Sequence, residues 1–142
     1  MFSLIQETFR EHAIIVPFLS LSIAISMKGL LSLIRGTFTL ERMLWSGWMP
    51  SAHSAFVVSL ATVMFLKHGF FSDEFLISFV FSIIIIYDAL NVRYQAGLHA
   101  QLLNEIIVKG ELKLNESIGH TPIEALAGTI IWVGISILLL GF

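Results

Sequence analysis

The sequence predicts an all-α integral membrane protein, a four-helix transmembrane bundle with an additional amphipathic helix or helices. Of the 142 residues, 56% are hydrophobic and 13% are charged, and the mean hydropathy is +0.88. Soluble domains carry roughly 25% charged residues, so a chain this apolar is expected to lie in a lipid bilayer. Four apolar segments separated by polar stretches set the number of spanning helices. We treat residues 1–142 as one membrane domain.

The four apolar segments differ in length. A spanning helix needs roughly 20 apolar residues, and only the first and last segments approach that length. The two middle segments must use flanking polar residues, tilt, or be sheltered by neighbours, and a homo-oligomer would provide such shelter. The segments are about Ala13–Met27 with its continuation to Ile34, Ala52–Leu66, Phe75–Tyr87 and Ala125–Phe142.

Local signals mark the starts of several helices. Thr121–Glu124 has the pattern of a capping box, with Pro122 at the first helical position. Ser72 is followed by two acidic residues, which suits the start of the third segment. Amphipathic helices are expected around Asn91–Val108 and at the N-terminus, where three apolar residues have helical spacing. These three are Phe2, Ile5 and Phe9.

The distribution of lysine and arginine predicts the orientation. With four spans, the two long polar connections, Gly36–Met49 and Asn91–His120, lie on the same side of the membrane. The positive-inside rule makes this side cytoplasmic, and we expect a bacterial inner (cell) membrane. If three of the six basic residues there serve chemistry, the bias falls to three against two. The six are Lys28, Arg35, Arg42, Arg93, Lys109 and Lys113, against Arg10 and Lys67 on the other side.

Composition argues against several other classes. The chain has no cysteine, so disulfides and thiolate metal sites are excluded. Its formal net charge of −2 and its lack of a basic tract argue against nucleic acid as a partner. Its N-terminal region does not begin like a cleavable signal peptide. The expected partners are membrane lipids.

The most informative stretch is Gly47–Ala55. Its central part, Pro50–Ser54, places a proline, two serines and a histidine at the start of the second segment. A serine such as Ser51 can cap the exposed backbone N–H groups, which also bind anions. His53 would stand beside a bound phosphate with a pKa suited to proton transfer. The alternative is an ordinary helix cap with an incidental histidine.

Three further polar groups lie on the same side of the membrane. Lys28 and Arg35 are two helical turns apart and share a face, and both suit phosphate oxygens, although interfacial snorkelling also explains them. Asp88 closes an apolar segment and begins a polar stripe that continues to His99. Arg93 would point roughly 140° away from this stripe, by the period of about 3.6 residues.

The direction of Arg93 leaves two alternatives for this region. Either the helix breaks near Ala96–Gly97, or Arg93 does not share a pocket with His99. An amphipathic helix lying on the membrane surface would explain the stripe without any chemistry. His120 directly precedes the capping box. It is either a catalytic residue or only the residue at which the chain enters the helix. Glu124 is assigned a structural role as a member of the box.

Together these groups indicate phosphoryl transfer. One histidine would attack phosphorus and another would protonate the leaving oxygen, while cations and N–H groups hold the remaining oxygens. The candidate catalytic residues are His53, His99, His120 and Asp88, and the candidate phosphate-binding residues are Lys28, Arg35, Ser51, Ser54 and Arg93.

These residues resemble the type-2 phosphatidic acid phosphatase family, which is related to vanadium haloperoxidases. Lys28 and Arg35 match its Lys-x6-Arg-Pro motif except that Gly36 replaces proline, and Pro50–His53 matches Pro-Ser-Gly-His with alanine for glycine. The third motif, Ser-Arg-x5-His-x3-Asp, is matched at Arg93 and His99 only, because Val92 and Leu103 replace its serine and aspartate.

The chain is more similar to the small divergent branch of this superfamily. Four ordered stretches carry that resemblance: Gly47–Ala55, Asp88–Arg93, Ala96–Asn104 and Gly119–Glu124. The parent family implies His53 as general acid, His99 as nucleophile, and Lys28, Arg35, Arg93 and Ser51 as phosphate ligands, with no cofactor. The divergent branch often has glutamine at the position of His99, which makes His120 a substitute nucleophile. Asp88 is a candidate to orient the imidazole.

Three functions follow from these observations. The first is a membrane phosphatase or phosphotransferase, a phosphoric monoester or diphosphate hydrolase sensitive to vanadate, that acts on a lipid phosphate or an isoprenoid pyrophosphate. The second is a non-catalytic membrane protein that binds anionic headgroups or assembles with partners, which the absent aspartate favours. The third is a metal site made by His53, Asp88, His99 and His120, a ligand set that suits zinc.

Overall fold

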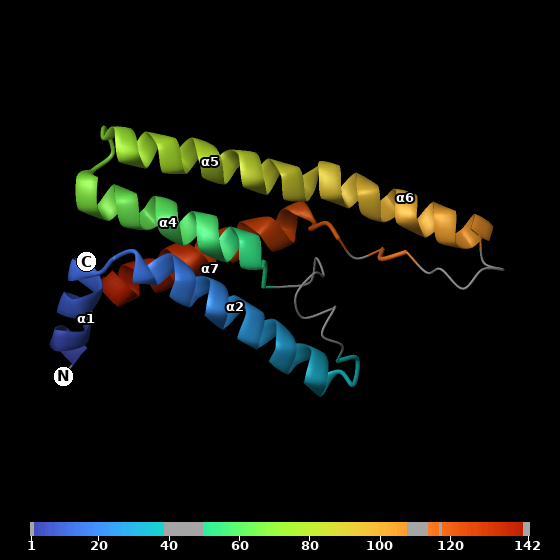
Figure 1. Ribbon diagram of the computed structural model, residues 1–142, viewed down its shortest axis with the longest axis horizontal. Coiled ribbons are helices and arrows are strands. Elements are labelled where there is room, and N and C mark those ends of the chain that lie inside the picture. The colour runs from blue at the N-terminus through green and yellow to red at the C-terminus, as the bar shows by residue number, and fades with distance from the viewer. Residues whose placement is uncertain (1, 39–49, 108–113, 117, 141–142) are drawn as a thin grey trace.

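The computed structural model describes residues 2–38, 50–107, 114–116 and 118–140, and these ranges contain helices and connections but no strand. Gly47–Met49, Arg42, Lys109 and Lys113, which the sequence analysis used, lie outside the described residues. The helices are α1 (Phe2–Glu11), α2 (Ile15–Ile34), α4 (Ala52–His68), α5 (Asp73–Leu90), α6 (Val92–Ile107) and α7 (Pro122–Leu140) (Figure 1).

The helical membrane bundle is confirmed, with one difference in helix length. By length and composition, α2, α7 and the nearly continuous stretch Asp73–Ile106 can cross a membrane, whereas α4 is apolar but has only 17 residues. The third span is longer than expected because α5 starts at the Ser72 cap and continues to Leu90. The expected amphipathic helix around Asn91–Val108 is α6.

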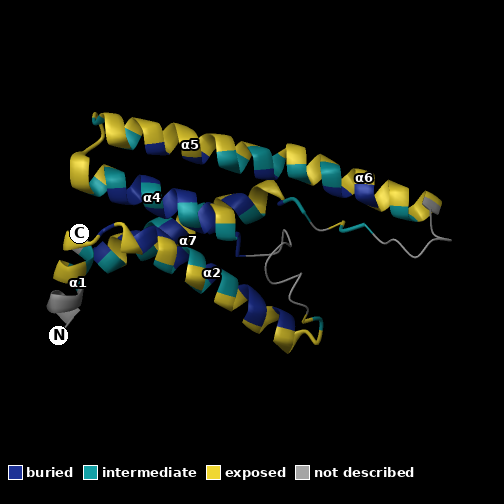
Figure 2. Cartoon of the chain, in the orientation of Figure 1, coloured by how far each residue is buried: buried dark blue, intermediate teal, exposed yellow. Residues whose placement is uncertain are grey.

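Helix α4 is the centre of the bundle. It packs against α2, α5 and α7, and buried residues are concentrated on it (Figures 1 and 2). Most of the buried side chains in these helices are small, which lets the helix backbones approach closely, as is common between membrane helices. They include Ser20, Ala24, Ala55, Ser59, Gly128 and Ser136.

Two apolar clusters fix the helices along their length. In one cluster Trp132 is fully buried against small residues of α2 and α4. The other cluster contains Val16, Val63 and Leu140, and Phe9 of α1 packs against it. Gln6 also donates a hydrogen bond to the Leu138 carbonyl at 3.2 Å. The expected N-terminal amphipathic helix is therefore docked on the bundle.

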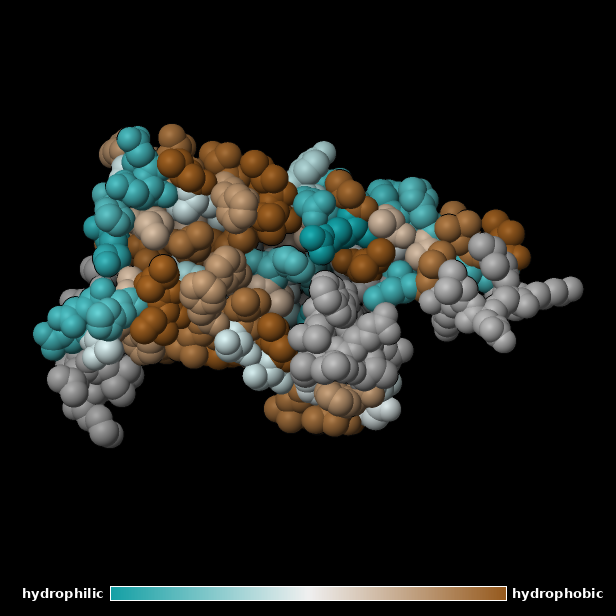
Figure 3. Space-filling model, viewed as in Figure 1, coloured by the Kyte–Doolittle hydropathy of each residue, from teal (hydrophilic) through white to brown (hydrophobic). Residues whose placement is uncertain are grey.

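Large apolar side chains cover the outer faces of the helices. Ile77, Ile84 and Ile130 are each more than half exposed, and Figure 3 shows apolar surface over the middle of the molecule. A soluble protein would not expose so much apolar surface, whereas hydrocarbon chains of lipid cover it without cost. The isoleucine-rich face of α5 therefore faces lipid.

The helix ends that border the two long connections lie at the same end of the bundle, as the sequence predicted. The C-terminal ends of α2 and α5 and the N-terminal ends of α4 and α7 all point toward it (Figure 1). We call this end the site end. The short turn between α4 and α5 lies at the opposite end, beside α1 and the C-terminal end of α7.

The chain bends only slightly between α5 and α6, and α6 then extends beyond the bundle (Figure 1). The interruption is at Asn91, where ψ is −72°, outside the usual helical range. The first alternative for this region, a break near Ala96–Gly97, is wrong, because α6 is continuous from Val92 to Ile107.

Candidate active site

Ser51 caps the N-terminus of α4 as predicted. Its backbone is extended, and its Oγ accepts a hydrogen bond from the Ser54 N–H at 3.2 Å. Pro50 precedes the cap by one residue and is buried, as are Ser51 and Ser54. His53 is the second residue of the helix and is exposed at the site end. The cap uses the Ser54 N–H, so the first N–H groups of the helix remain for an anion.

Lys28 enters the site end from α2. Its side chain is only 6% exposed, and Ser32, one turn later on the same face, is also buried. The Ser32 hydroxyl donates to the Gly29 carbonyl at 2.7 Å, so its proton is already used. Arg35 ends the helix as its C-cap and is exposed. A buried lysine is unusual, and in a membrane helix it marks a functional site by default.

Asp88 and Arg93 lie on the two sides of the Asn91 interruption. Arg93 Nε is 2.6 Å from Asp88 Oδ2, and both side chains are partly exposed. A straight helix would place these two positions roughly 140° apart, yet Arg93 Nε reaches the Asp88 carboxylate across the interruption at Asn91. Arg93 therefore shares the site end with Asp88, and this carboxylate is paired with the guanidinium.

His120 is fixed where the chain enters α7. Its backbone N–H donates to the Ala89 carbonyl of α5 at 3.2 Å, and its side chain is only 4% exposed. Thr121 and Glu124 form the predicted capping box: Thr121 N–H donates to Glu124 Oε2 at 2.9 Å, and Glu124 N–H donates to the threonine hydroxyl at 3.4 Å. The last turn before the helix is therefore well defined.

Glu124 also faces the His120 ring. Its Oε2 is 3.7 Å from His120 Nδ1, and this buried nitrogen has no hydrogen-bond partner. The sequence pattern indicated only a structural role for Glu124, as a member of the capping box. The capping box fixes the carboxylate, and the i,i+4 spacing from His120 places it beside the ring. That spacing was the available signal for a second role.

Electrostatics connect these groups across five segments. Burial lowers the pKa of His120 below its ordinary value, the Glu124 carboxylate opposes that shift, and the charges of Lys28 and His53 add to it. The charges of Arg93, Lys28 and Asp88 in turn act on His53. We refer to Lys28, His53, Asp88, Arg93, His120 and Glu124 as the site cluster.

His99 is outside the site cluster. It is exposed on α6, beyond the bundle, and no interaction described for this structure joins it to His53 or His120. The second alternative raised by the polar stripe agrees with the structure: Arg93 is paired with Asp88, and no interaction described for this structure joins Arg93 to His99.

Gly97 of α6 and Gly119 allow the segment that leads to His120 to lie directly against α6. A Cβ on Gly97 would lie 2.6 Å from the Glu116 carbonyl oxygen, and a Cβ on Gly119 would lie 2.3 Å from Tyr94 Cα. Neither approach leaves room for a side chain. We call residues 114–116 and 118–120 the strap, because they run back along α6 to α7.

Asn104 fastens the far end of the strap. Its Oδ1 accepts from the Leu114 N–H at 2.9 Å, and its Nδ2 donates to the Leu114 carbonyl at 2.9 Å and to Glu116 Oε1 at 2.7 Å. In the sequence, Asn104 is distinguished only as the last residue of the divergent motif Ala96–Asn104. Its role depends on a segment ten residues away, which sequence spacing alone does not place.

The described residues do not favour the metal-site hypothesis. No group of three or more histidine and carboxylate side chains within them lies close enough to hold a metal ion. Asp88 is paired with Arg93, and His99 is on a separate surface.

The fold and the site define a helical integral membrane protein with a cluster of cations and histidines at one end. Its sequence matches the Divergent PAP2 family over residues 9–137, and the chain belongs to that family. A relative from Bacillus subtilis (strain 168), the uncharacterized membrane protein YuiD, is 32% identical over 115 aligned positions, which cover 68% of this chain and 73% of the relative. No solved structure matches the chain.

Proposed function

We propose that this protein is a membrane phosphatase or phosphotransferase that acts on a lipid phosphate or pyrophosphate. The observation that carries the proposal is the convergence of Lys28, His53, Arg93 and His120, which come from four separate segments, at one end of an apolar bundle. Cations bind phosphate oxygens, and two imidazoles can provide a nucleophile and an acid. Membership of a PAP2-related family supports the same chemistry.

In the proposed reaction, His120 is the nucleophile. Its lowered pKa keeps the ring neutral near pH 7, and a proton on Nδ1 directed at Glu124 would leave the Nε2 lone pair free. Nε2 attacks phosphorus as the P–O bond to the lipid breaks. The negative charge of the bound phosphate favours the protonated form of His53, and this imidazolium donates its proton to the leaving oxygen. Lys28 and Arg93 stabilise the charge on the other phosphate oxygens.

The second half of the reaction restores the protein. His53, now neutral, takes a proton from water as the water oxygen attacks phosphorus and the P–N bond to His120 breaks. Inorganic phosphate leaves, and both histidines return to their starting forms. In a phosphotransferase an alcohol replaces the water. The distance of 3.7 Å between His120 Nδ1 and Glu124 would shorten when substrate binds, as hydrogen bonds in active sites often do.

The test is phosphate release by the purified protein in detergent, with lipid phosphates and pyrophosphates as substrates. We expect vanadate-sensitive release that His53→Ala reduces at least about 100-fold, the usual size of a general-acid contribution. His12→Ala is the matched control, because His12 lies at the opposite end of the bundle. Absence of release from every substrate, in protein that retains its helical circular dichroism, would overturn the proposal.

The second candidate is a non-catalytic protein that binds anionic headgroups or assembles with partners. The Asp88–Arg93 pair favours it, because this carboxylate is engaged by a cation and not by a histidine. Under this function, removal of the Arg93 charge would weaken binding of lipid-phosphate vesicles, whereas His53→Ala and His120→Ala would leave binding unchanged.

A further inference from the structure

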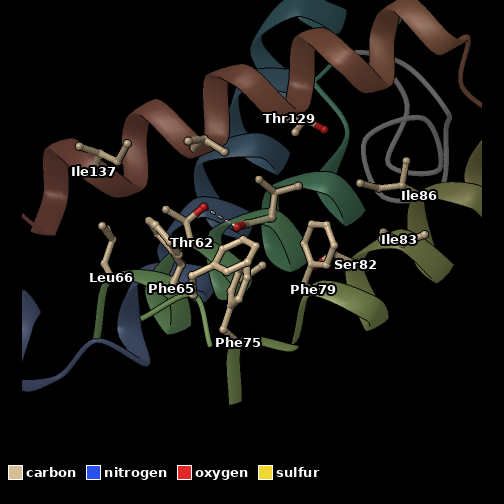
Figure 4. A pocket seen from close by; sticks show the side chains of 14 residues that line it. Thr62, Phe65, Leu66, Phe75, Phe79, Ser82, Ile83, Ile86, Thr129 and Ile137 are labelled. Atoms are coloured by element: carbon tan, nitrogen blue, oxygen red, sulfur yellow. Dashed lines mark hydrogen bonds between the residues drawn. The ribbon is translucent and has the colours of Figure 1, made fainter. Parts of the chain in front are cut away.

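The bundle contains an apolar cavity next to the site cluster. It has a volume of about 430 Å³ and lies between α4, α5 and α7 (Figure 4). Aliphatic and aromatic side chains line most of it, and none of its lining residues is charged. The lining residues include Val58, Phe79, Ile83, Ile86, Val133 and Ile137.

The three hydroxyl groups that line the cavity are already occupied. Thr62 donates to the Val58 carbonyl at 2.8 Å, as Figure 4 shows. Ser82 donates to the carbonyl of Val57 or of Ser78, and Thr129 donates to the Ala125 carbonyl. No hydroxyl proton is left for a ligand, so the cavity suits a hydrocarbon and not a polar group.

The cavity is a groove that begins next to the site cluster and runs toward the opposite end of the bundle. Along the helix axes, at about 1.5 Å per residue, Ile86 is about 3 Å from Asp88 and Val58 is about 6 Å from Ser54. From Val58 the lining continues along α4 to Leu66, about 12 Å further toward the opposite end of the bundle.

The side of the groove opens toward lipid. Phe79, Ile83 and Ile137 line it and are 46%, 51% and 37% exposed, on faces of α5 and α7 that the apolar surface places in the bilayer. A hydrocarbon chain can therefore enter sideways from the membrane without crossing a polar barrier. A soluble phosphate ester has no part that would fill the groove.

We infer that this groove holds the first part of the hydrocarbon chain of the lipid whose phosphate group binds at the site cluster. The inference rests on the proposed function and extends it, because it makes the substrate a long-chain lipid phosphate and not a soluble ester. The groove then positions the scissile bond. A hydrocarbon chain held beside Val58 and Ile86 determines how far the phosphate group extends toward His53 and His120.

The experiment compares long-chain and short-chain forms of the same lipid phosphate. Val133→Phe and Thr129→Leu add volume to the groove, and Ile130→Phe adds the same ring outside it, on the exposed face of α7. We expect the two groove variants to lower kcat/KM for the long-chain substrate about tenfold, which is the low end of the effect of a hydrophobic pocket on specificity. The short-chain substrate and Ile130→Phe should give wild-type values. Equal losses with both substrates, or no loss in either groove variant, would overturn the inference.

A second measurement separates failure of the groove from failure of the proposed function. A lipid phosphate with a photoreactive group in its chain is cross-linked to the full-length protein, beside the same lipid ending in a free hydroxyl. Phosphate-dependent labelling of α5 and α7 at the groove supports the inference even if no turnover occurs. Equal labelling by both lipids would show that bulk bilayer lipid fills the groove and would overturn the inference.

Discussion

The site cluster and the part of α6 that follows Arg93 carry the same kinds of residues, but these residues have different roles in the two regions. At the site cluster, the charges of Lys28 and Arg93 act on His53, and the charges of Lys28 and His53 act on His120. On α6, His99 is exposed, and the residues around it, Gly97 and Asn104, hold the strap. Arg93 and His99 match the spacing of a catalytic motif. The residues beside His99 nevertheless position the strap, which leads to a different catalytic candidate, His120.

The largest expected effect tests this contrast directly. Because His120 is in the site cluster and His99 is not, His120→Ala should lower kcat/KM for lipid phosphate at least about 100-fold, whereas His99→Ala should leave it within a few-fold. Steady-state phosphate release measures both. A severe loss in His99→Ala together with near-normal activity in His120→Ala would make His99 the nucleophile and reverse the comparison.

The next effect concerns the contact between the strap and α6. Gly119→Ala places a Cβ against the Tyr94 backbone, which cannot move aside, so it should reduce the free energy of unfolding by about 1–3 kcal/mol. Gly134→Ala is the matched control: its Cβ meets nothing within 4 Å, and alanine is favoured over glycine in a helix. Thermal unfolding in detergent compares them. Equal stability of the two variants would contradict the close approach.

Asn104→Ala should have a smaller effect on stability and a specific effect on the strap. It removes the hydrogen bonds to Leu114 and Glu116, most of them partly exposed, which costs about 1–2 kcal/mol. Hydrogen exchange at the Leu114 N–H should accelerate, and kcat should fall because His120 lies at the other end of the strap. Gln101→Ala, on an exposed part of α6, is the control and should change neither quantity.

The smallest expected effect is a change in pH dependence. Burial keeps the pKa of His120 below its ordinary value of about 6.5, so the acid limb of kcat/KM should lie below pH 6.5. Glu124 raises this pKa, and Glu124→Gln should therefore move the acid limb to still lower pH. Thr121→Ser, which leaves the carboxylate in place, should not move it. A shift of the limb to higher pH in Glu124→Gln would contradict the pairing of Glu124 with His120.

Protonation of His120 should also affect stability in a defined direction. The folded state favours the neutral ring, so the unfolded state binds more protons between the lowered pKa and about 6.5. The contribution of His120 is therefore fully present above pH 6.5 and is lost as the pH falls through the lowered pKa. Unfolding of wild type and His120→Gln at several pH values measures this contribution as the difference between the two proteins.

The elements that depend on neighbouring residues were predicted well. Ser51, Ser72 and Thr121 accept from backbone N–H groups within the first turn of α4, α5 and α7, as their sequence patterns indicated. The apolar composition established the membrane class, and the ordered motifs indicated the family, which the match over residues 9–137 confirms.

The parts of the site that depend on distant contacts were predicted less completely. A straight helix points Arg93 away from the polar stripe that runs from Asp88 to His99, so the sequence left open whether Arg93 and His99 share a pocket; in the structure Arg93 pairs with Asp88 across the interruption at Asn91. The proximity of Glu124 to the His120 ring was missed, because the capping box already explained the carboxylate. The role of Asn104 was missed because its partner belongs to another segment.

The sequence by itself determined that this is a helical membrane protein, where its helices begin, and which family it belongs to. These properties arise from composition and from contacts within a helical turn. The tertiary structure alone decided that His53 and His120 share one end of the bundle with Lys28, whereas His99 lies on α6 outside the site cluster. That outcome depends on how α2, α4, α5 and α7 pack, which no local spacing contains.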